Sequence, residues 1–404
     1  MAKVMIFGAG PSGIMAAISA ATAGHSVCII DKNSKIGRKL YISGKGRCNL
    51  TNIRPDFISN VVRNPKFLYS SLSIFSPEKC MSLFESLGVP LKVERGGRIF
   101  PKSDKSSDVI DALYGELKRL NVEISFQETL IKLIAINGKI TKAITNKSEY
   151  IYDNYIIATG GLSYPKTGSD GSGIEILKEI NVDIIETKPG LVHILLEEPI
   201  LPKGLSLRNV RVKVLNINNM TIADSFGEMI FMDNGVSGPI ILTISSIINR
   251  IENLNKCKLV IDLKPALSSE VLDSRLIRDF ESKSNQDLKN ILLGLMPERL
   301  IRIVLQKANI CGEIKANQAS KELRKRLSYT IKNLSFSISS LGPIEEAIVT
   351  SGGVSVNEID PKTMKSIKYK NLSYAGEVVD IDALTGGYNI QIAFSTGYLA
   401  GFSL

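Results

Sequence analysis

The chain of 404 residues contains no tryptophan and only two histidines, His25 and His193. Histidine is the commonest metal ligand and the commonest general acid or base. The chain therefore has few residues for catalysis by histidine or by a metal that histidines bind, and we expect no metal site. Five cysteines occur without a Cys-x-x-Cys pair, at positions 28, 48, 80, 257 and 311. Their spacing predicts neither a disulfide framework nor a zinc site, and we expect a reducing cytoplasm.

Long apolar runs are also missing. No uncharged apolar stretch reaches the ~18 residues of a membrane span. The first apolar run has only the length of a strand, is preceded by Lys3 and leads directly into Gly8, so it does not resemble a signal peptide. With 44% hydrophobic residues, the chain can bury large cores. We expect a soluble protein of two or three domains without a membrane partner.

The charge balance is positive, with 50 Lys and Arg against 40 Asp and Glu, a net charge of +10. An excess of this size raises the question of nucleic acid. The basic residues are spread along the chain, however. The densest run, from Lys321 to Arg326, has helical spacing, which favours a solvated helix face over an RNA contact. We expect no specific nucleic-acid partner.

The strongest motif lies at the N-terminus, where an apolar run leads into Gly8-x-Gly10-x-x-Gly13, an alanine-rich stretch and a second apolar run ending at Asp31. Gly8 permits a tight turn, Gly10 lets the backbone approach a pyrophosphate, and Gly13 lets the helix pack on the strand. The helix N-terminus favours phosphates. Asp31 would accept hydrogen bonds from a ribose 2′-hydroxyl. The pattern predicts a dinucleotide site; the alternative is a strand–helix–strand unit without a ligand.

A long polar, glycine-broken loop follows at residues 33–52. Such a loop in a compact domain is usually functional or disordered. Its Gly44-x-Gly46 segment would let backbone N–H groups face a flat ring. The alternative is a mobile basic surface loop. Four basic side chains in it would neutralise a pyrophosphate: Arg38, Lys39, Lys45 and Arg47.

Three later segments have the same character. An apolar strand runs into Ala158-Thr159-Gly160-Gly161, another ends in Ala375-Gly376-Glu377, and Gly386-Gly387-Tyr388-Asn389 opens a helix. The carboxylate of Glu377 suits ribityl hydroxyls, and the helix start would direct N–H groups at the N1–C2=O edge of a flavin. The alternative is a closing strand and helix without a ligand. Between these segments, residues 191–264 alternate as strands do and residues 267–327 have helical periods.

Together these motifs resemble the BaiN/RdsA-type NAD(P)/FAD-dependent oxidoreductases, also called YhiN-like or aminoacetone-oxidase-like flavoproteins. The resemblance spans nearly the whole chain. It rests on Gly8-x-Gly10-x-x-Gly13, Gly37-Arg38-Lys39, the run from Ser43 to Asn52, Gly97-Arg98-Ile99-Phe100-Pro101, Thr159-Gly160-Gly161, Ser163-Tyr164-Pro165-x-Thr167-Gly168-Ser169, Gly376-Glu377 and Gly386-Gly387-Tyr388-Asn389.

The resemblance implies an α/β fold, with a Rossmann-like FAD-binding domain built from both chain ends, an inserted β-barrel-like domain and a helical subdomain. We expect the FAD-binding domain at 1–190 and 345–404, the barrel-like insert at 191–266 and 328–344, and the helical subdomain at 267–327. The chain departs from the family in the insert, where Met232-Asp233-Asn234 stand in place of Thr-His.

The motifs and the resemblance name cofactor contacts but no catalytic residue. Tyr164, Tyr388 and Glu377 are the first candidates for proton donation, and His193 is a further one. Cys48 fits an ordinary packed residue better than a redox thiol. The predicted FAD contacts are Gly8, Gly10, Pro11, Ser12, Gly13, Asp31, Lys32, Arg38, Lys39, Gly46, Arg47, Cys48, Asn49, Leu130, Thr159, Gly160, Gly376, Glu377, Gly387, Tyr388, Asn389 and Ile390.

We therefore expect an FAD-dependent oxidoreductase that moves hydride between the flavin and a small organic substrate. No second Gly-x-Gly-x-x-Gly is present for a nicotinamide, so NAD(P)H would bind only transiently. Two alternatives remain open. One is an FAD-dependent tRNA-modifying enzyme, and the other is a non-enzymatic flavin-binding regulatory protein.

Overall fold

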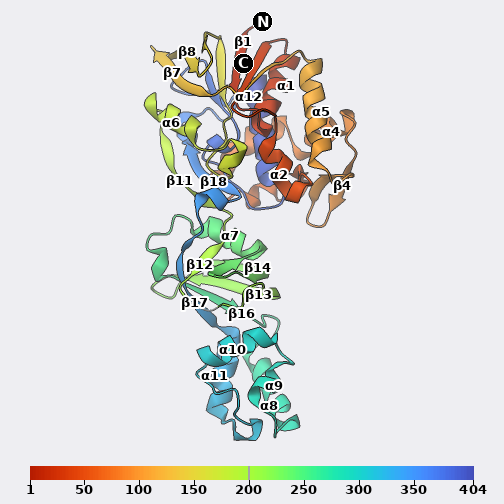
Figure 1. Cartoon of the computed structure of the whole chain (residues 1–404), viewed down its shortest axis with the longest axis vertical. Coiled ribbons are helices and arrows are strands. Elements are labelled where there is room, and N and C mark those ends of the chain that lie inside the picture. The colour runs from red at the N-terminus through yellow and green to blue at the C-terminus, as the bar shows by residue number, and fades with distance from the viewer. Residues whose placement is uncertain (199–200) are drawn as a thin grey trace. The chain divides into compact units, whose positions relative to one another are not determined.

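The computed structural model describes residues 1–198 and 201–404. The chain folds as two compact units, one comprising Met1–Gly190 and Pro343–Leu404 and the other Leu191–Gly342 (Figure 1). Each unit has its own apolar core. Both chain ends therefore contribute to the first unit, and the second is inserted into it.

A five-stranded parallel sheet forms the centre of the first unit, in the order β19-β10-β1-β2-β6. The residues of β1 from Val4 to Phe7 are buried, as expected for a central strand covered on both faces. Because the strands are parallel, their carboxyl ends meet at one edge, where ligands bind in open α/β sheets. The strands are β1 (Lys3–Phe7), β2 (Ser26–Asp31), β6 (Glu123–Phe126), β10 (Asn154–Ile157) and β19 (Leu372–Tyr374).

Helices from the two ends of the chain, α1 (Pro11–Thr22) and α12 (Tyr388–Phe402), pack closely on each other. A Cβ atom at Gly397 would lie 2.1 Å from the carbonyl oxygen of Ser12, and one at Gly401 would lie 2.2 Å from that of Ala16. The two backbones approach this closely only because these positions carry no side chain. Small residues at the end of the chain thus join it to the N-terminal motif.

Three small antiparallel sheets and five further helices complete the first unit. The sheets are β3 (Thr51–Asn52), β5 (Arg98–Pro101) and β4 (Leu91–Glu94); β7 (Leu130–Ile136), β8 (Lys139–Thr145) and β9 (Glu149–Tyr150); and β11 (Ile184–Gly190) with β18 (Val349–Val354). The helices are α2 (Arg38–Gly46), α3 (Tyr69–Ile74), α4 (Pro77–Ser86), α5 (Ser106–Arg119) and α6 (Ser172–Glu179).

Helix α2 corrects one expectation, because residues 33–52 were expected to form a loop throughout. The helix begins after Gly37, whose φ of +64° redirects the chain, and Leu40 anchors it in the core. Its single buried apolar residue gave no detectable helical period. Non-helical angles at Ser43, Gly44 and Lys45 then break it into two turns.

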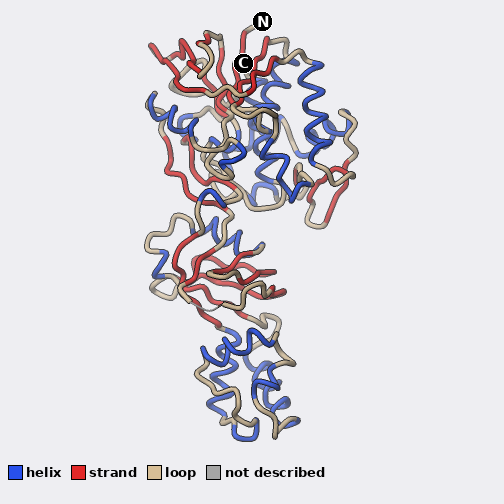
Figure 2. Tube along the Cα trace, viewed as in Figure 1, coloured by secondary structure: helices blue, strands red, loops and turns tan. Residues whose placement is uncertain are grey.

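The second unit contains a closed six-stranded barrel, in the order β12-β15-β14-β13-β16-β17, and an all-helical part (Figure 2). With the parallel sheet of the first unit, this confirms the predicted fold class. No helix in the described part of the chain is long and apolar enough to cross a membrane. The barrel strands are β12 (Ile194–Leu196), β13 (Ser206–Leu215), β14 (Thr221–Phe231), β15 (Gly235–Ser237), β16 (Lys258–Asp262) and β17 (Leu334–Leu341). The helices of this unit are α7 (Pro239–Ile248), α8 (Ser269–Ser282), α9 (Leu288–Leu292), α10 (Glu298–Lys307) and α11 (Lys321–Lys332).

Candidate functional site

The glycine turn between β1 and α1 has the geometry of a phosphate cradle. A Cβ atom at Gly8 would lie 2.3 Å from the carbonyl oxygen of Ala158, and one at Gly13 would lie 1.8 Å from that of Gly8, so both positions require glycine. A Cβ at Gly10 would meet no protein atom within 4 Å, so open space lies beside that backbone. Pro11 starts α1 without an acidic residue in its first turn, and no described side chain caps the helix. This helix end can therefore receive an anion.

Asp31 lies at the end of β2 and holds the same turn. Its Oδ2 atom accepts a hydrogen bond of 2.6 Å from the backbone N–H of Ala9, and Oδ1 accepts one of 2.7 Å from that of Asn33. The Asn33 side-chain amide also donates to Oδ1 at 2.9 Å. A carboxylate offers about four acceptor positions, so Asp31 retains capacity for one further donor such as a ribose hydroxyl. The backbone N–H of Glu128 donates to the Asp31 carbonyl at 3.0 Å, which brings the start of β7, Leu130, close to this end of the site.

A polar cluster joins α2 to the segment after β19. The Lys39 ammonium donates to Glu377 Oε2 and to the Ser163 hydroxyl, both at 2.6 Å. The Ser163 hydroxyl donates to Glu377 Oε1 at 2.6 Å, and the Thr350 backbone N–H donates to the same oxygen at 2.9 Å. Gly376 precedes the carboxylate at φ +77°, where a Cβ would lie 2.4 Å from the Ser12 hydroxyl oxygen. Glu377 is thus fixed beside the first turn of α1.

The environment of Glu377 keeps its carboxyl group ionised. Burial alone would raise its pKa, but the Lys39 ammonium and the hydrogen bonds from Ser163 and Thr350 outweigh burial and hold the pKa below its ordinary value. Glu377 is therefore an acceptor at neutral pH and not a proton donor. This removes one of the three residues considered first for proton donation.

The loop that follows β10 contains a further buried polar group. Thr159 has a buried hydroxyl oxygen for which no partner is found among the described residues. A Cβ at Gly173 would lie 2.1 Å from that oxygen, so the approach of α6 depends on a glycine. Gly160 has a φ of +76°, and a Cβ there would lie 2.5 Å from the Ser169 hydroxyl oxygen. An unsatisfied buried polar atom is costly and is commonly explained by a missing ligand or water.

The N-terminus of α12 forms a second cradle. Gly387 precedes the helix at φ +99°, no described side chain caps it, and no acidic residue lies in its first turn. A Cβ at Gly387 would lie 2.5 Å from the carbonyl oxygen of Thr51 and 2.8 Å from Asn49 Oδ1. Asn49 Oδ1 and Thr51 Oγ1 are both buried without a hydrogen-bond partner among the described residues. The free N–H groups of the first turn of α12 thus lie close to the free oxygens of Asn49 and Thr51.

The side chains that open α12 are themselves held in place. Asn389 exchanges two hydrogen bonds with the backbone of Ala383, accepting at 2.9 Å and donating at 2.7 Å. Tyr388 is 3% exposed and packs edge-on against Phe57, with ring centres 5.0 Å apart. Burial raises the pKa of Tyr388, so its hydroxyl stays protonated at neutral pH. The backbone N–H groups of the first turn, at Asn389 and Ile390, remain to meet a ligand.

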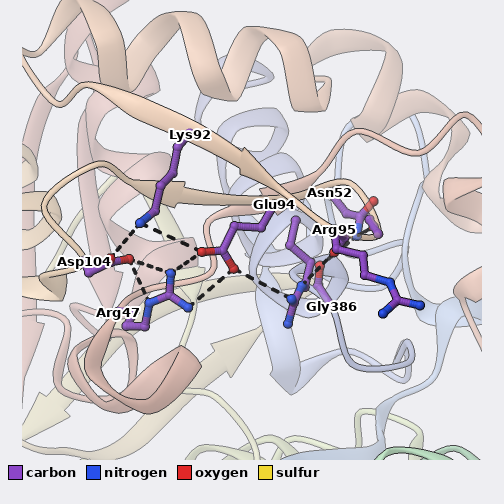
Figure 3. A network of polar contacts seen from close by, with 9 residues as sticks. Arg47, Asn52, Lys92, Glu94, Arg95, Asp104 and Gly386 are labelled. Atoms are coloured by element: carbon purple, nitrogen blue, oxygen red, sulfur yellow. Dashed lines mark hydrogen bonds and ion pairs between the residues drawn. The ribbon is translucent and has the colours of Figure 1, made fainter. Parts of the chain in front are cut away.

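Arg47 lies in a network of charged groups at the β4–β5 hairpin (Figure 3). Its guanidinium donates to Asp104 at 2.6 and 2.8 Å and to Glu94, and it stacks 4.2 Å from the centre of the Phe100 ring. Lys92 joins the network through a 2.6 Å bond to Asp104. Glu94 also lies 3.7 Å from Arg98, so the two carboxylates are shared among three cations. The guanidinium of Arg47, which the sequence directs at a pyrophosphate, is thus engaged within the protein.

The other basic residues of the predicted set differ in their partners. The Lys32 ammonium pairs with Asp170 at 2.6 Å, and the exposed Arg38 donates to Asn33 Oδ1 at 2.8 Å. Cys48 is fully buried at φ +59°, and burial raises its pKa to about 12. Its thiol is therefore unsuited to redox chemistry near neutral pH.

The predicted FAD contacts omit three residues of this region, Asn52, Ser163 and Thr350, of which the first two lie in motifs that carry the family resemblance. Thr350 Oγ1 accepts the backbone N–H groups of Leu162 and Ser163 at 2.7 and 3.1 Å, so it shapes the loop that bonds Glu377. The signal was only a small polar residue next to a glycine pair. Such residues are common in loops, and the two partners of Thr350 are 188 and 187 positions away. His193 lies in the second unit, near Gly342 of the same unit.

These features fit FAD. Two uncapped helix N-termini, a glycine with open space beside its backbone, and three buried acceptors without partners (Asn49, Thr51 and Thr159) match a ligand with a pyrophosphate, hydroxyl groups and a polar ring edge.

Comparisons with known proteins agree with this geometry. The family described as the HI0933-like protein Rossmann domain matches residues 2–403. A 3-dehydro-bile acid delta(4,6)-reductase from Clostridium scindens is 28% identical over 404 residues, covering 99% of this chain and 98% of the relative. A ribosomal RNA dihydrouridine synthase from Escherichia coli is 30% identical over 396 residues, covering 98% and 96%.

Solved structures show the same fold. A 3-ketosteroid delta4-(5alpha)-dehydrogenase from Rhodococcus jostii aligns with a TM-score of 0.51 at 13% identity, covering all of this chain and 95% of that one. A 3-ketosteroid delta1-dehydrogenase from Sterolibacterium denitrificans aligns with a TM-score of 0.54 at 11% identity, covering 99% and 98%. The family resemblance noted in the sequence is confirmed: this chain belongs to the HI0933-like Rossmann family of FAD-dependent oxidoreductases.

Proposed function

We propose that this protein binds FAD through the residues predicted from the sequence and reduces a carbon–carbon double bond conjugated to a carbonyl group in a small organic substrate, with NAD(P)H as a transient reductant. The observation that carries the proposal is the cradle at the start of α12, where free helix N–H groups lie beside the unpartnered acceptors Asn49 Oδ1 and Thr51 Oγ1. The helix N–H groups suit a ring edge that gains negative charge on reduction, and the free acceptor oxygens suit a ring N–H donor beside that edge.

FAD, when bound, supplies hydride chemistry at its N5 atom. The chain supplies the positions around it. Gly10 and the α1 N-terminus would receive the pyrophosphate, and Asp31 would accept from the adenosine ribose. Glu377, held ionised by Lys39, would accept from ribityl hydroxyls. Tyr388, a buried residue whose raised pKa keeps its hydroxyl protonated, would donate a proton near the same helix end.

The proposed substrate class is supported by what the relatives' names have in common. A 3-dehydro-bile acid with delta(4,6) unsaturation and uridine both contain a carbon–carbon double bond conjugated to a carbonyl. Hydride addition to such a bond places negative charge on the carbonyl oxygen, which a hydrogen-bond donor must stabilise. We propose this shared bond type as the target here, and a small enone as the substrate that carries it.

The test is anaerobic reduction of the FAD-loaded protein by NADH and by NADPH, followed by mixing with a cyclic enone. Re-oxidation of the flavin with formation of the saturated ketone supports the proposal. A reduced flavin that is re-oxidised by oxygen but not by any enone contradicts it. A matched amount of the saturated ketone is the control, because it offers the carbonyl without the double bond.

A second candidate is reduction of uridine in RNA, which the names of two relatives favour. The surface of the β4–β5 hairpin also permits it: Arg95 is exposed, and Figure 3 shows its guanidinium directed away from the Arg47 network. An exposed cation near a cofactor site could meet a phosphate. In the same re-oxidation experiment, a uridine-containing RNA that re-oxidises the flavin while the enone does not would favour this candidate.

A further inference from the structure

Asn52, the second residue of β3, joins three segments of the first unit. Its side-chain amide group donates to the carbonyl oxygen of Gly96 at 3.0 Å and to that of Gly386 at 2.9 Å. Its Oδ1 atom accepts from the backbone N–H of Arg54 at 3.0 Å. Asn52 is 1% exposed. One buried amide therefore links β3, the turn of the β4–β5 hairpin and the turn that opens α12, as Figure 3 shows for Asn52 and Gly386.

Two glycines lie against the Asn52 side chain. A Cβ at Gly97 would lie 2.8 Å from Asn52 Oδ1, and one at Gly386 would lie 3.4 Å from Asn52 Nδ2. Both glycines have positive φ angles, +74° and +131°. The amide therefore sits between two turns that only glycine adopts easily, and the carbonyl oxygens they present are satisfied by its N–H groups.

The turn that Asn52 holds sets the direction of α12. Gly386 and Gly387 immediately precede the helix, whose first turn has no side-chain cap among the described residues. Thr51, the neighbour of Asn52 in β3, is fully buried with its hydroxyl oxygen unpartnered, and a Cβ at Gly387 would meet its carbonyl oxygen. The helix end and the free acceptor are thus placed by the same short strand.

We infer that Asn52 is a positioning residue that fixes the α12 N-terminus against the flavin and thereby stabilises the reduced, more negative form of FAD relative to the oxidised form. The inference rests on the proposed placement of FAD. Both amide N–H groups of Asn52 donate to carbonyl oxygens, so an aspartate of the same shape would place an anion against two acceptors. Asn52 itself reaches the cofactor only through the helix it orients.

The experiment compares the midpoint potential of bound FAD, and the dissociation constants of oxidised and reduced FAD, in wild type, Asn52→Ala and Asn52→Asp. We expect reduced FAD to bind about tenfold more weakly relative to oxidised FAD in both variants, within the range of a helix-terminus effect. For a two-electron couple this lowers the potential by about 30 mV. A change in Asn52→Asp alone would be a direct effect of the new charge and would overturn the inference.

Asn371 supplies the matched control. It is a buried amide of the same unit that donates to the carbonyl oxygens of Ile140 and Asp153 at 2.9 and 3.2 Å, at the start of β10 and not at the carboxyl edge of the sheet. Asn371→Ala and Asn371→Asp should reduce stability without moving the potential. An equal shift in the Asn371 variants would show a general loss of structure and would overturn the inference.

Two further measurements keep the outcomes distinct. If Asn52→Ala does not fold, Asn52→Ser, which keeps one donor, should show a smaller shift of the same sign; an unchanged potential in it contradicts the inference. The potential is measured without substrate, so an enzyme that binds FAD but ignores enones refutes the proposed reaction and leaves this inference standing. Loss of FAD binding in wild type would refute both.

Discussion

Lys39 and Glu377 are 338 positions apart in the chain, and the Lys39 ammonium nitrogen lies 2.6 Å from Glu377 Oε2. The pair joins α2 to the segment that follows β19, so it links the N-terminal and C-terminal parts of the FAD-binding unit. Their side chains are 24% and 18% exposed, which limits screening by solvent. The pair is therefore expected to affect both stability and cofactor retention.

The first prediction concerns pH. The pKa of Glu377 is lowered in the folded protein from an ordinary value of 4.5. A carboxyl whose pKa is lowered by folding contributes stability that is present above its unfolded pKa and is lost as the pH falls through its folded pKa. Wild type should therefore lose stability below about pH 4.5. Glu377→Gln should be less stable at pH 7 by about 2 kcal/mol, on the scale of hydrogen bonds to charged groups.

Urea unfolding at pH 7 and at pH 3.5 measures this difference. The gap between wild type and Glu377→Gln should narrow at the lower pH, because the carboxyl of unfolded wild type takes up a proton there while the folded carboxyl, with its lowered pKa, resists protonation. Glu175→Gln, which removes a carboxylate from an exposed pair with Lys178, is the control and should change little at either pH. A gap that widens on acidification would contradict the assigned ionisation of Glu377.

The second prediction separates two glycines of the same motif. Gly10→Val should fold, because a Cβ at Gly10 meets no protein atom and its φ of −81° suits any residue, yet the side chain would fill the space beside the expected pyrophosphate. Gly13→Ala should destabilise the fold, because its Cβ would lie 1.8 Å from the Gly8 carbonyl oxygen. Flavin absorbance and thermal unfolding distinguish a folded, colourless Gly10→Val from an unstable Gly13→Ala. A Gly10→Val protein that retains full FAD would contradict the placement.

The sequence predicted the local parts of this site better than the long-range ones. The strand–turn–helix unit around Gly8 follows from spacing and glycine chemistry, and these act within a few residues. The role of Asn52 depends on Gly386, 334 residues away, and no periodicity reports such a bond. Arg47 shows the same limit: its positive charge was visible, but its partners Glu94 and Asp104 become neighbours only after the β4–β5 hairpin folds onto α2.

The third prediction concerns the insert. Deleting residues 191–342 and joining Gly190 to Pro343 should leave a protein that binds FAD but has no turnover. The first unit has its own core, and Gly190 already pairs with Val349 between β11 and β18, so the new connection is short. FAD titration and thermal unfolding of the shortened chain provide the measurement. Failure to fold would show that the first unit depends on the insert; the division of the insert at residues 267 and 327 stays a prediction.

The last prediction distinguishes a small-molecule substrate from an RNA substrate, and it concerns Arg47. The guanidinium donors of Arg47 are engaged by Glu94 and Asp104, so they are not free to meet a phosphate backbone. Arg47→Ala should therefore leave RNA affinity unchanged, and it should lower FAD retention, because the loop before Cys48 and Asn49 loses its anchor on Phe100. Arg95→Ala, which removes an exposed cation outside that network, is the matched control.

Wild type should bind tRNA and a scrambled RNA of the same length equally, with dissociation constants no tighter than about 10⁻⁴ to 10⁻⁶ M at physiological salt, the range of non-specific binding. A protein that modifies a folded RNA must instead recognise its shape, so it would prefer the folded molecule. Filter binding at two salt concentrations measures both quantities. A tRNA-selective complex that survives about 200 mM salt and weakens in Arg95→Ala would favour RNA as the substrate, because diffuse surface charge alone is screened under those conditions.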